Sequence, residues 1–149
     1  MTREEFINEL NIKNYSYNIE GNKITVTYNG GNVDLDEITT LPSFVEFNNS
    51  GEVWLSILKT IPTGIVFRNK GNVYLSNVKK ISTDVVFENE GYVYLEGLSK
   101  ISDKLIFNNR GEVNLDSIFG GYFSDWDDNI GGIKPNRLLN LMINKGMFI

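Results

Sequence analysis

The sequence predicts a mainly β protein in which about five 20-residue coils stack into a parallel β-solenoid. The first observation is an internal repeat: glycines recur every 20 residues, and each is followed two residues later by Val and four later by Leu. Repeats of this length are typical of stacked architectures, in which one unit cannot bury its apolar face alone. The three columns are Gly31, Gly51, Gly71, Gly91 and Gly111; Val33, Val53, Val73, Val93 and Val113; and Leu35, Leu55, Leu75, Leu95 and Leu115.

The second observation is that each repeat contains two short alternating runs. The two runs are residues 65–67 (Ile-Val-Phe) and 73–75 (Val-Tyr-Leu). In each, the first and third side chains are apolar and are predicted to face inward, as in a strand with one buried face. The segment between them, 68–71, ends in Gly and is typical of a turn. Each coil is therefore predicted to be a strand, a turn, a second strand and a looser segment held by Val78 and Ile81.

Polar columns support the in-register stack. Lys70, Glu90 and Arg110 are 20 residues apart and alternate in sign, and opposite charges on paired strands stabilise a sheet. Arg68 is related to Glu88 in the same way. An Asn column predicts a structural ladder, because buried amides can satisfy the turn backbone and one another. Its members are Asn49, Asn69, Asn89 and Asn109.

The first 30 residues are predicted to cap the open end of the stack. Thr2 and Glu5 fit a capping box at a helix N-terminus, and Phe6 and Leu10 share one face of that helix. Two alternating runs then flank Gly21-Asn22, a pattern typical of a hairpin. A helix and a hairpin should therefore cover the first coil.

The repeats span residues 31–118, and residues 119–149 are predicted to form a helical C-terminal cap, so that one domain covers 1–149. Pro135 suits the first turn of a helix, and Gly146 suits its end. The apolar side chains between them fall on one helical face. These side chains are Leu138, Leu139, Met142 and Ile143.

Composition removes several classes of chemistry. The chain has no Cys and no His, which excludes disulfides, thiolate chemistry and the commonest general base and metal ligand. Its net charge of −5 argues against direct nucleic-acid binding, since phosphate neutralisation needs a cationic surface. No apolar run approaches the length of a membrane span, and the charged N-terminal sequence is not followed by an apolar signal region. We expect a cytoplasmic protein without membrane contact.

The repeat unit resembles that of short leucine-rich-repeat-like β-solenoids of bacteria and their phages, over residues 31–118. The resemblance is carried by Ile61, Pro62, Gly64, Ile65, Phe67, Asn69, Gly71, Val73, Leu75 and Val78, with Leu41-Pro42 opening the preceding unit in the same way. It implies a leucine-rich-repeat-like solenoid and an interaction protein rather than an enzyme. For many members of the group it also implies a phage origin.

The first candidate binding surface is a column of aromatic residues on the second strand. Its members should point outward, because the flanking Val and Leu point inward and side chains alternate along a strand. Tyr and Trp are enriched at binding hot spots. The competing interpretation is that aromatics favour strands and stack on one another for stability. The candidate residues are Trp54, Tyr74, Tyr92 and Tyr94.

Two further surfaces are weaker candidates. Like charges recur at neighbouring positions of one turn and would suit an acidic partner or phosphates, although solvated lysines are the simpler interpretation. These residues are Lys59, Lys79, Lys80 and Lys100. An exposed stripe on the first strand is interpreted as ordinary β-propensity, or as a face covered by the C-terminal segment. It consists of Glu46, Val66, Val86 and Ile106.

No metal, cofactor or catalytic residue is expected. Residues 125–131 (Asp-Trp-Asp-Asp-Asn-Ile-Gly) resemble the opening of a calcium loop, but the Gly comes one place late and the twelfth position is Asn136 instead of Glu. The carboxylates form no recognisable acid–base pair, and no motif organises Ser, Lys or Tyr for chemistry.

The leading hypothesis is therefore a non-enzymatic protein–protein interaction module. By resemblance it would be phage-encoded, with a host protein as partner in the host cytoplasm. One alternative is a phage anti-defence inhibitor that offers its acidic surface to a nucleic-acid-binding host enzyme. Another is a glycan-binding solenoid, because rows of aromatic rings suit sugars, whereas cleavage would need two carboxylates across a groove. A second copy of the chain, forming a homodimer, is a further candidate partner.

Overall fold

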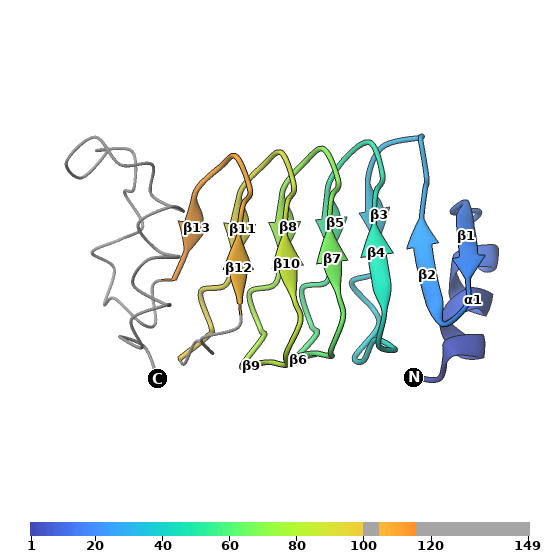
Figure 1. The fold of residues 1–149 in the computed structure, drawn as a ribbon, viewed down its shortest axis with the longest axis horizontal. Helices are drawn as coiled ribbons and strands as arrows, with labels where there is room; N and C mark the ends of the chain where they lie inside the picture. The colour runs from blue at the N-terminus through green and yellow to red at the C-terminus, as the bar shows by residue number, and fades with distance from the viewer. Residues whose placement is uncertain (100–104, 116–149) are drawn as a thin grey trace.

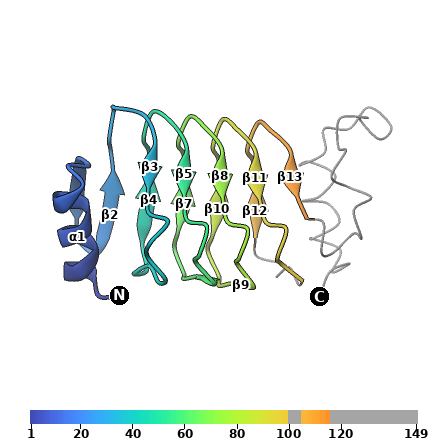
Figure 2. The same cartoon turned by 180° about the vertical axis from the view of Figure 1, so that it is seen from behind.

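A computed structural model describes residues 1–99 and 105–115 of the chain. It is mainly β, with one N-terminal helix and a parallel stacked β-solenoid of about four turns (Figure 1). The coils lie side by side along the long axis, and the helix α1 (Arg3–Ile12) lies at the N-terminal end, as the view from behind also shows (Figure 2). The predicted solenoid is confirmed.

Each coil contributes one strand to each of two long sheets. Sheet A runs in the order β1 (Tyr17–Glu20), β2 (Lys23–Val26), β4 (Val45–Phe47), β7 (Val66–Phe67), β10 (Val86–Phe87) and β12 (Ile106–Phe107). Sheet B runs in the order β13 (Val113–Asn114), β11 (Val93–Tyr94), β8 (Val73–Tyr74), β5 (Val53–Trp54) and β3 (Val33–Asp34). All neighbouring strands are parallel except β1 and β2.

The predicted 20-residue register is confirmed. In sheet B, Val73 pairs with both Val53 and Val93. In sheet A, Phe87 pairs with Phe67 and Phe107. The phenyl rings of this column are fully buried or nearly so, and successive rings stack with centroids 5.0–5.3 Å apart. Fully burying such a side chain contributes roughly 1.5–3 kcal/mol, so the repeated columns build the core.

The Asn column is a structural ladder, as predicted, in which each amide Nδ2 donates to backbone carbonyl oxygens. In Asn89, Nδ2 lies 3.1 Å from the carbonyl oxygens of Gly71 and Gly91 and 3.2 Å from that of Tyr92. Each amide thus joins its own turn to the turn of the preceding coil. The expectation that the amides would also satisfy one another was wrong, because the Oδ1 atoms of Asn49, Asn69 and Asn89 are buried without a hydrogen-bond donor.

The N-terminal cap has the predicted elements. The side chain of Thr2 accepts a 3.1 Å hydrogen bond from the Glu5 backbone N–H, and Phe6 and Leu10 of α1 are fully buried. The hairpin turns at Gly21, whose φ of +61° suits glycine. Strand β2 does more than cap the stack, since it pairs in parallel with β4 and so forms the first strand of the parallel stack in sheet A.

The segment after sheet B was predicted to be loose, yet it contains a third, two-stranded sheet of β6 (Thr60–Ile61) and β9 (Lys80–Ile81). Its hydrogen bonds run between adjacent coils and depend on stacking. The sequence of a single repeat therefore shows no clear strand pattern at this position. The predicted cap helix from Pro135 to Gly146 and residues 125–131 lie outside the described residues.

Candidate functional site

The predicted aromatic column lies on the outer face of sheet B. Trp54 pairs with Tyr74 across β5 and β8, and Tyr74 pairs with Tyr94 across β8 and β11. All three side chains are half-buried and not fully exposed as expected, whereas Tyr92 is 41% exposed. Tyr74 and Tyr94 partly cover each other, since their rings stack with centroids 4.8 Å apart and an interplanar angle of 3°.

Glu52 holds the aromatic row in place. Its Oε1 accepts a 3.1 Å hydrogen bond from the Trp54 indole N–H, and its Oε2 accepts from the Tyr74 hydroxyl at 3.0 Å and from Asn72 Nδ2 at 3.1 Å. Glu52 was not among the residues predicted from the sequence. The available signal was its position, because Glu52 lies two residues before Trp54 and side chains at that spacing share one face of a strand.

The far end of the row is an aromatic cluster. The Tyr92 and Tyr94 rings lie with centroids 6.2 Å apart and are tilted by 51°. Burial is the first cause that raises the pKa of Tyr94, and the neighbouring Tyr74 and Tyr92 raise it further. Because the raised pKa lies further above neutral pH, the Tyr94 hydroxyl stays protonated there and can donate a hydrogen bond.

Two shallow depressions flank the row, and each combines aromatic side chains with a carboxylate. The first is lined by Asp36, Trp54, Ser56 and Tyr74. The second is lined by Tyr92, Val93, Tyr94, Glu112 and Asn114. The outer face of sheet B therefore offers apolar rings and acidic groups together.

Removing the Glu52 carboxylate should loosen the row. We expect Glu52→Ala to lower the free energy of unfolding by about 1–2 kcal/mol, because three donors lose a charged acceptor in a partly exposed place. Urea denaturation of the variant, with exposed Glu90→Ala as the control, measures the difference. Equal midpoints for the two variants would show that the Glu52 contacts add nothing to stability.

The lysine surface is only partly assembled within the described residues. Lys59 and Lys79 are exposed neighbours on adjacent coils, because the Lys79 N–H donates to the Lys59 carbonyl at 2.8 Å. Lys80 is exposed and pairs with Thr60 across β9 and β6. Lys79 Nζ also donates to the carbonyl oxygen of Gly97 at 3.2 Å. Lys100 lies outside the described residues.

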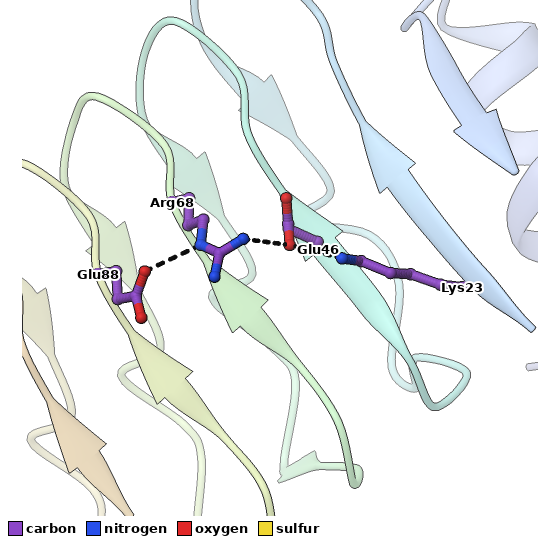
Figure 3. Close-up of polar contacts among 4 residues, drawn as sticks. All are labelled: Lys23, Glu46, Arg68 and Glu88. Atoms are coloured by element: carbon purple, nitrogen blue, oxygen red, sulfur yellow. Dashed lines mark hydrogen bonds and ion pairs between the residues drawn. The ribbon is translucent and has the colours of Figure 1, made fainter. Parts of the chain in front are cut away.

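The outer face of sheet A carries a charge network (Figure 3). Glu46 Oε1 contacts Lys23 Nζ at 2.9 Å and an Arg68 guanidinium nitrogen at 3.0 Å, and Arg68 Nε contacts Glu88 at 2.9 Å. The predicted Arg68–Glu88 pair is confirmed. The prediction that Glu46 is exposed was wrong, because Lys23 and Arg68 close over it and leave 5% of it accessible.

The other residues of the predicted stripe on sheet A differ in how far they are exposed to solvent. Val66 and Val86 are half-buried, and Ile106 is 44% exposed. The stripe is thus broken by the Glu46 ion pairs at one end and does not form a continuous apolar surface.

The described residues define the class of protein as a repeat protein built as a β-solenoid with a 20-residue period. No protein-family model, curated protein or solved structure matches the chain. Within residues 1–99 and 105–115, no three or more acidic side chains converge as a metal site would require. None of the helices in the same part of the chain is long and apolar enough to cross a membrane.

Proposed function

We propose that the protein is a non-enzymatic protein-binding module that uses the outer face of sheet B. The observation that carries this proposal is the row of Trp54, Tyr74 and Tyr94, which follows the repeat register and is held by stacking and by Glu52. Side chains already fixed in one conformation lose little entropy when a partner docks. Tyr and Trp also offer much contact area at low entropic cost, as in antibody combining sites.

Ring geometry favours a protein over a glycan as the partner. A sugar ring packs flat on the face of an aromatic ring, but the facing surfaces of Tyr74 and Tyr94 are covered by each other. What this pair offers outward is ring edges and hydroxyl groups, which suit the mixed apolar and polar surface of a protein. The resemblance of the repeats to phage solenoids adds the proposal that the partner is a host protein of the cytoplasm.

Replacing Trp54 and Tyr74 together by Ser tests the proposal. Partner binding should weaken by at least about 100-fold, because hot-spot aromatics each contribute about 2 kcal/mol or more. The measurement is affinity capture from a cell lysate with the intact protein, quantified by mass spectrometry. Circular dichroism and a thermal melt check that the variant is folded.

Lys59→Ser with Lys79→Ser is the control, because it removes two neighbouring lysines of the rival surface and changes no strand residue of sheet B. This variant should retain the partners captured by the wild-type protein. Loss of the partners with the lysine variant, and their retention by the aromatic variant, would assign Trp54 and Tyr74 a purely structural role.

A further inference from the structure

We propose that the face of sheet B receives a cationic segment of the partner, with an Arg or Lys side chain entering the depression lined by Asp36, Trp54, Ser56 and Tyr74. This inference rests on the proposed function and adds the chemistry of the partner. It follows from the distribution of charge between the two sheets and from the groups that line the depression.

The segments that build sheet B carry charge of one sign. Residues 31–37, 51–57, 71–77, 91–97 and 111–115 contain no Lys or Arg. The same segments contain six carboxylates, so this side of the solenoid is strongly acidic. A surface of one sign attracts and orients a partner of the opposite sign. The six residues are Asp34, Asp36, Glu37, Glu52, Glu96 and Glu112.

The carboxylates of Asp36 and Glu52 beside Trp54 accept hydrogen bonds from neutral donors, and these bonds leave the negative charge of both groups uncompensated. Oδ1 of Asp34 accepts from the Asp36 backbone N–H at 3.0 Å, and Oδ1 of Asp36 accepts from the Ser56 N–H at 2.8 Å. The donors to Glu52 are an indole N–H, an amide and a hydroxyl. At the N-terminal end of the row, the Lys13 ammonium forms an ion pair with Glu37 and is also attracted by the charge of Asp34.

Sheet A differs because its charges compensate one another. Glu46 lies between Lys23 and Arg68, and Arg68 also reaches Glu88, so acids and bases alternate along that face (Figure 3). An alternating network attracts a charged partner weakly, since the contributions of its members cancel within a Debye length of about 8–10 Å. A cationic segment should therefore prefer sheet B.

The depression has the chemistry that a guanidinium or ammonium group requires. Trp54 and Tyr74 supply apolar walls for the alkyl stem of an Arg or Lys side chain. An ionised carboxylate has about four lone-pair sites, so Asp36 can accept from a cation while it keeps its bond to Ser56. A cation beside an indole in a partly desolvated site gains further attraction.

The test selects random linear peptides, displayed on ribosomes, against the full-length protein. We expect the recovered peptides to be enriched in Arg and Lys relative to the unselected library. The best peptide should bind Asp34→Asn/Asp36→Asn at least about tenfold more weakly than the wild-type protein, since one charge-assisted hydrogen bond is worth that much. Asn retains the Oδ1 acceptor that each Asp offers to the backbone, so the fold should be preserved.

The matched control is Asp84→Asn/Glu20→Gln, which removes the same charge from exposed residues on or beside sheet A. It should change peptide affinity by less than about twofold, since neither residue belongs to the segments that build sheet B and salt screens exposed charges beyond a Debye length. A second measurement needs no variant of the protein: replacing Arg of the peptide by neutral citrulline should abolish binding to the wild-type chain.

Each of the three measurements can overturn the proposal. The selection would do so if it recovered no peptides, or peptides without an excess of Arg and Lys. The other contradicting results are equal affinity of the citrulline and Arg peptides for the wild-type protein, and equal loss of peptide affinity in the two charge variants. Failure of the proposed function is distinguishable from these. If the captured partners are lost with Trp54→Ser/Tyr74→Ser and retained by Asp34→Asn/Asp36→Asn, the face binds a partner whose recognition is not cationic.

Discussion

Replacing Phe87 by Ala is expected to lower the free energy of unfolding by about 3–5 kcal/mol. The Phe87 ring is fully buried in the middle of the stack. Its centroid lies 5.0 Å from the ring centroid of Phe67 and 5.0 Å from that of Phe107. Its removal leaves a cavity that two neighbouring coils would have to close. The effect should extend beyond one coil, because each repeat is stabilised mainly by its neighbours.

Urea denaturation followed by circular dichroism measures this loss. The matched control is Val86→Ala, which alters the adjacent, half-buried residue of β10 on the outward face and should cost less than about 1.5 kcal/mol. If Phe87→Ala unfolds at the same urea concentration as the wild-type protein, the inward assignment of the Phe column is wrong.

The second large effect is expected from Asn89→Ala, which should lower the free energy of unfolding by about 1–3 kcal/mol. The buried Nδ2 group donates to the carbonyl oxygens of Gly71, Gly91 and Tyr92, and its loss breaks the side-chain link between two adjacent turns. The isosteric Asn89→Asp should lower the free energy of unfolding further at neutral pH, because it places a buried carboxylate against the same carbonyl oxygens.

The control for the ladder is Asn108→Ala, which changes an exposed Asn next to the buried column. Its midpoint should match that of the wild-type protein within the error of the measurement. A tolerated Asn89→Asp would contradict the account, because it would show that the donor in the turn is dispensable.

The stacking order of the solenoid was predictable from sequence because it depends on one strict period. Once Val73 and Val93 are equivalent, all columns between them are in register, and alternation decides which side chains face inward. Aromatic stacking at Phe67 and Phe87 follows from the same register. The N-terminal helix was predictable from a local signal, the pairing of the Thr2 side chain with the first turn.

What sequence analysis missed depends on contacts between coils. Glu46 occupies an outward position of a strand, and it is covered by the long side chains of Lys23 on β2 and of Arg68, which directly follows β7. Strand β2 lies outside the strict period, since Ile24 pairs with Val45, 21 residues later. A search for residues 20 apart therefore assigned it to the cap alone.

The position of the candidate site could be predicted from the sequence, but the burial of its side chains could not. Alternation placed Trp54, Tyr74 and Tyr94 on one outer face in one row, as found. The degree of their burial could not be predicted, because it results from ring stacking and from the hydrogen bonds of Glu52. The acidic residues of this face are visible in the sequence, but they form one surface only when the carboxylates of four coils are brought together by stacking.

The central claim is that the partner docks on the outer face of sheet B, and hydroxyl-radical footprinting tests it most directly. The protein is oxidised alone and in its captured complex, and the oxidation of each side chain is compared by mass spectrometry. We expect Trp54, Tyr74 and Tyr92 to be protected in the complex, while exposed Ile106 on sheet A reacts equally in both. Protection of Ile106 with unchanged oxidation of Trp54 and Tyr74 would contradict the claim.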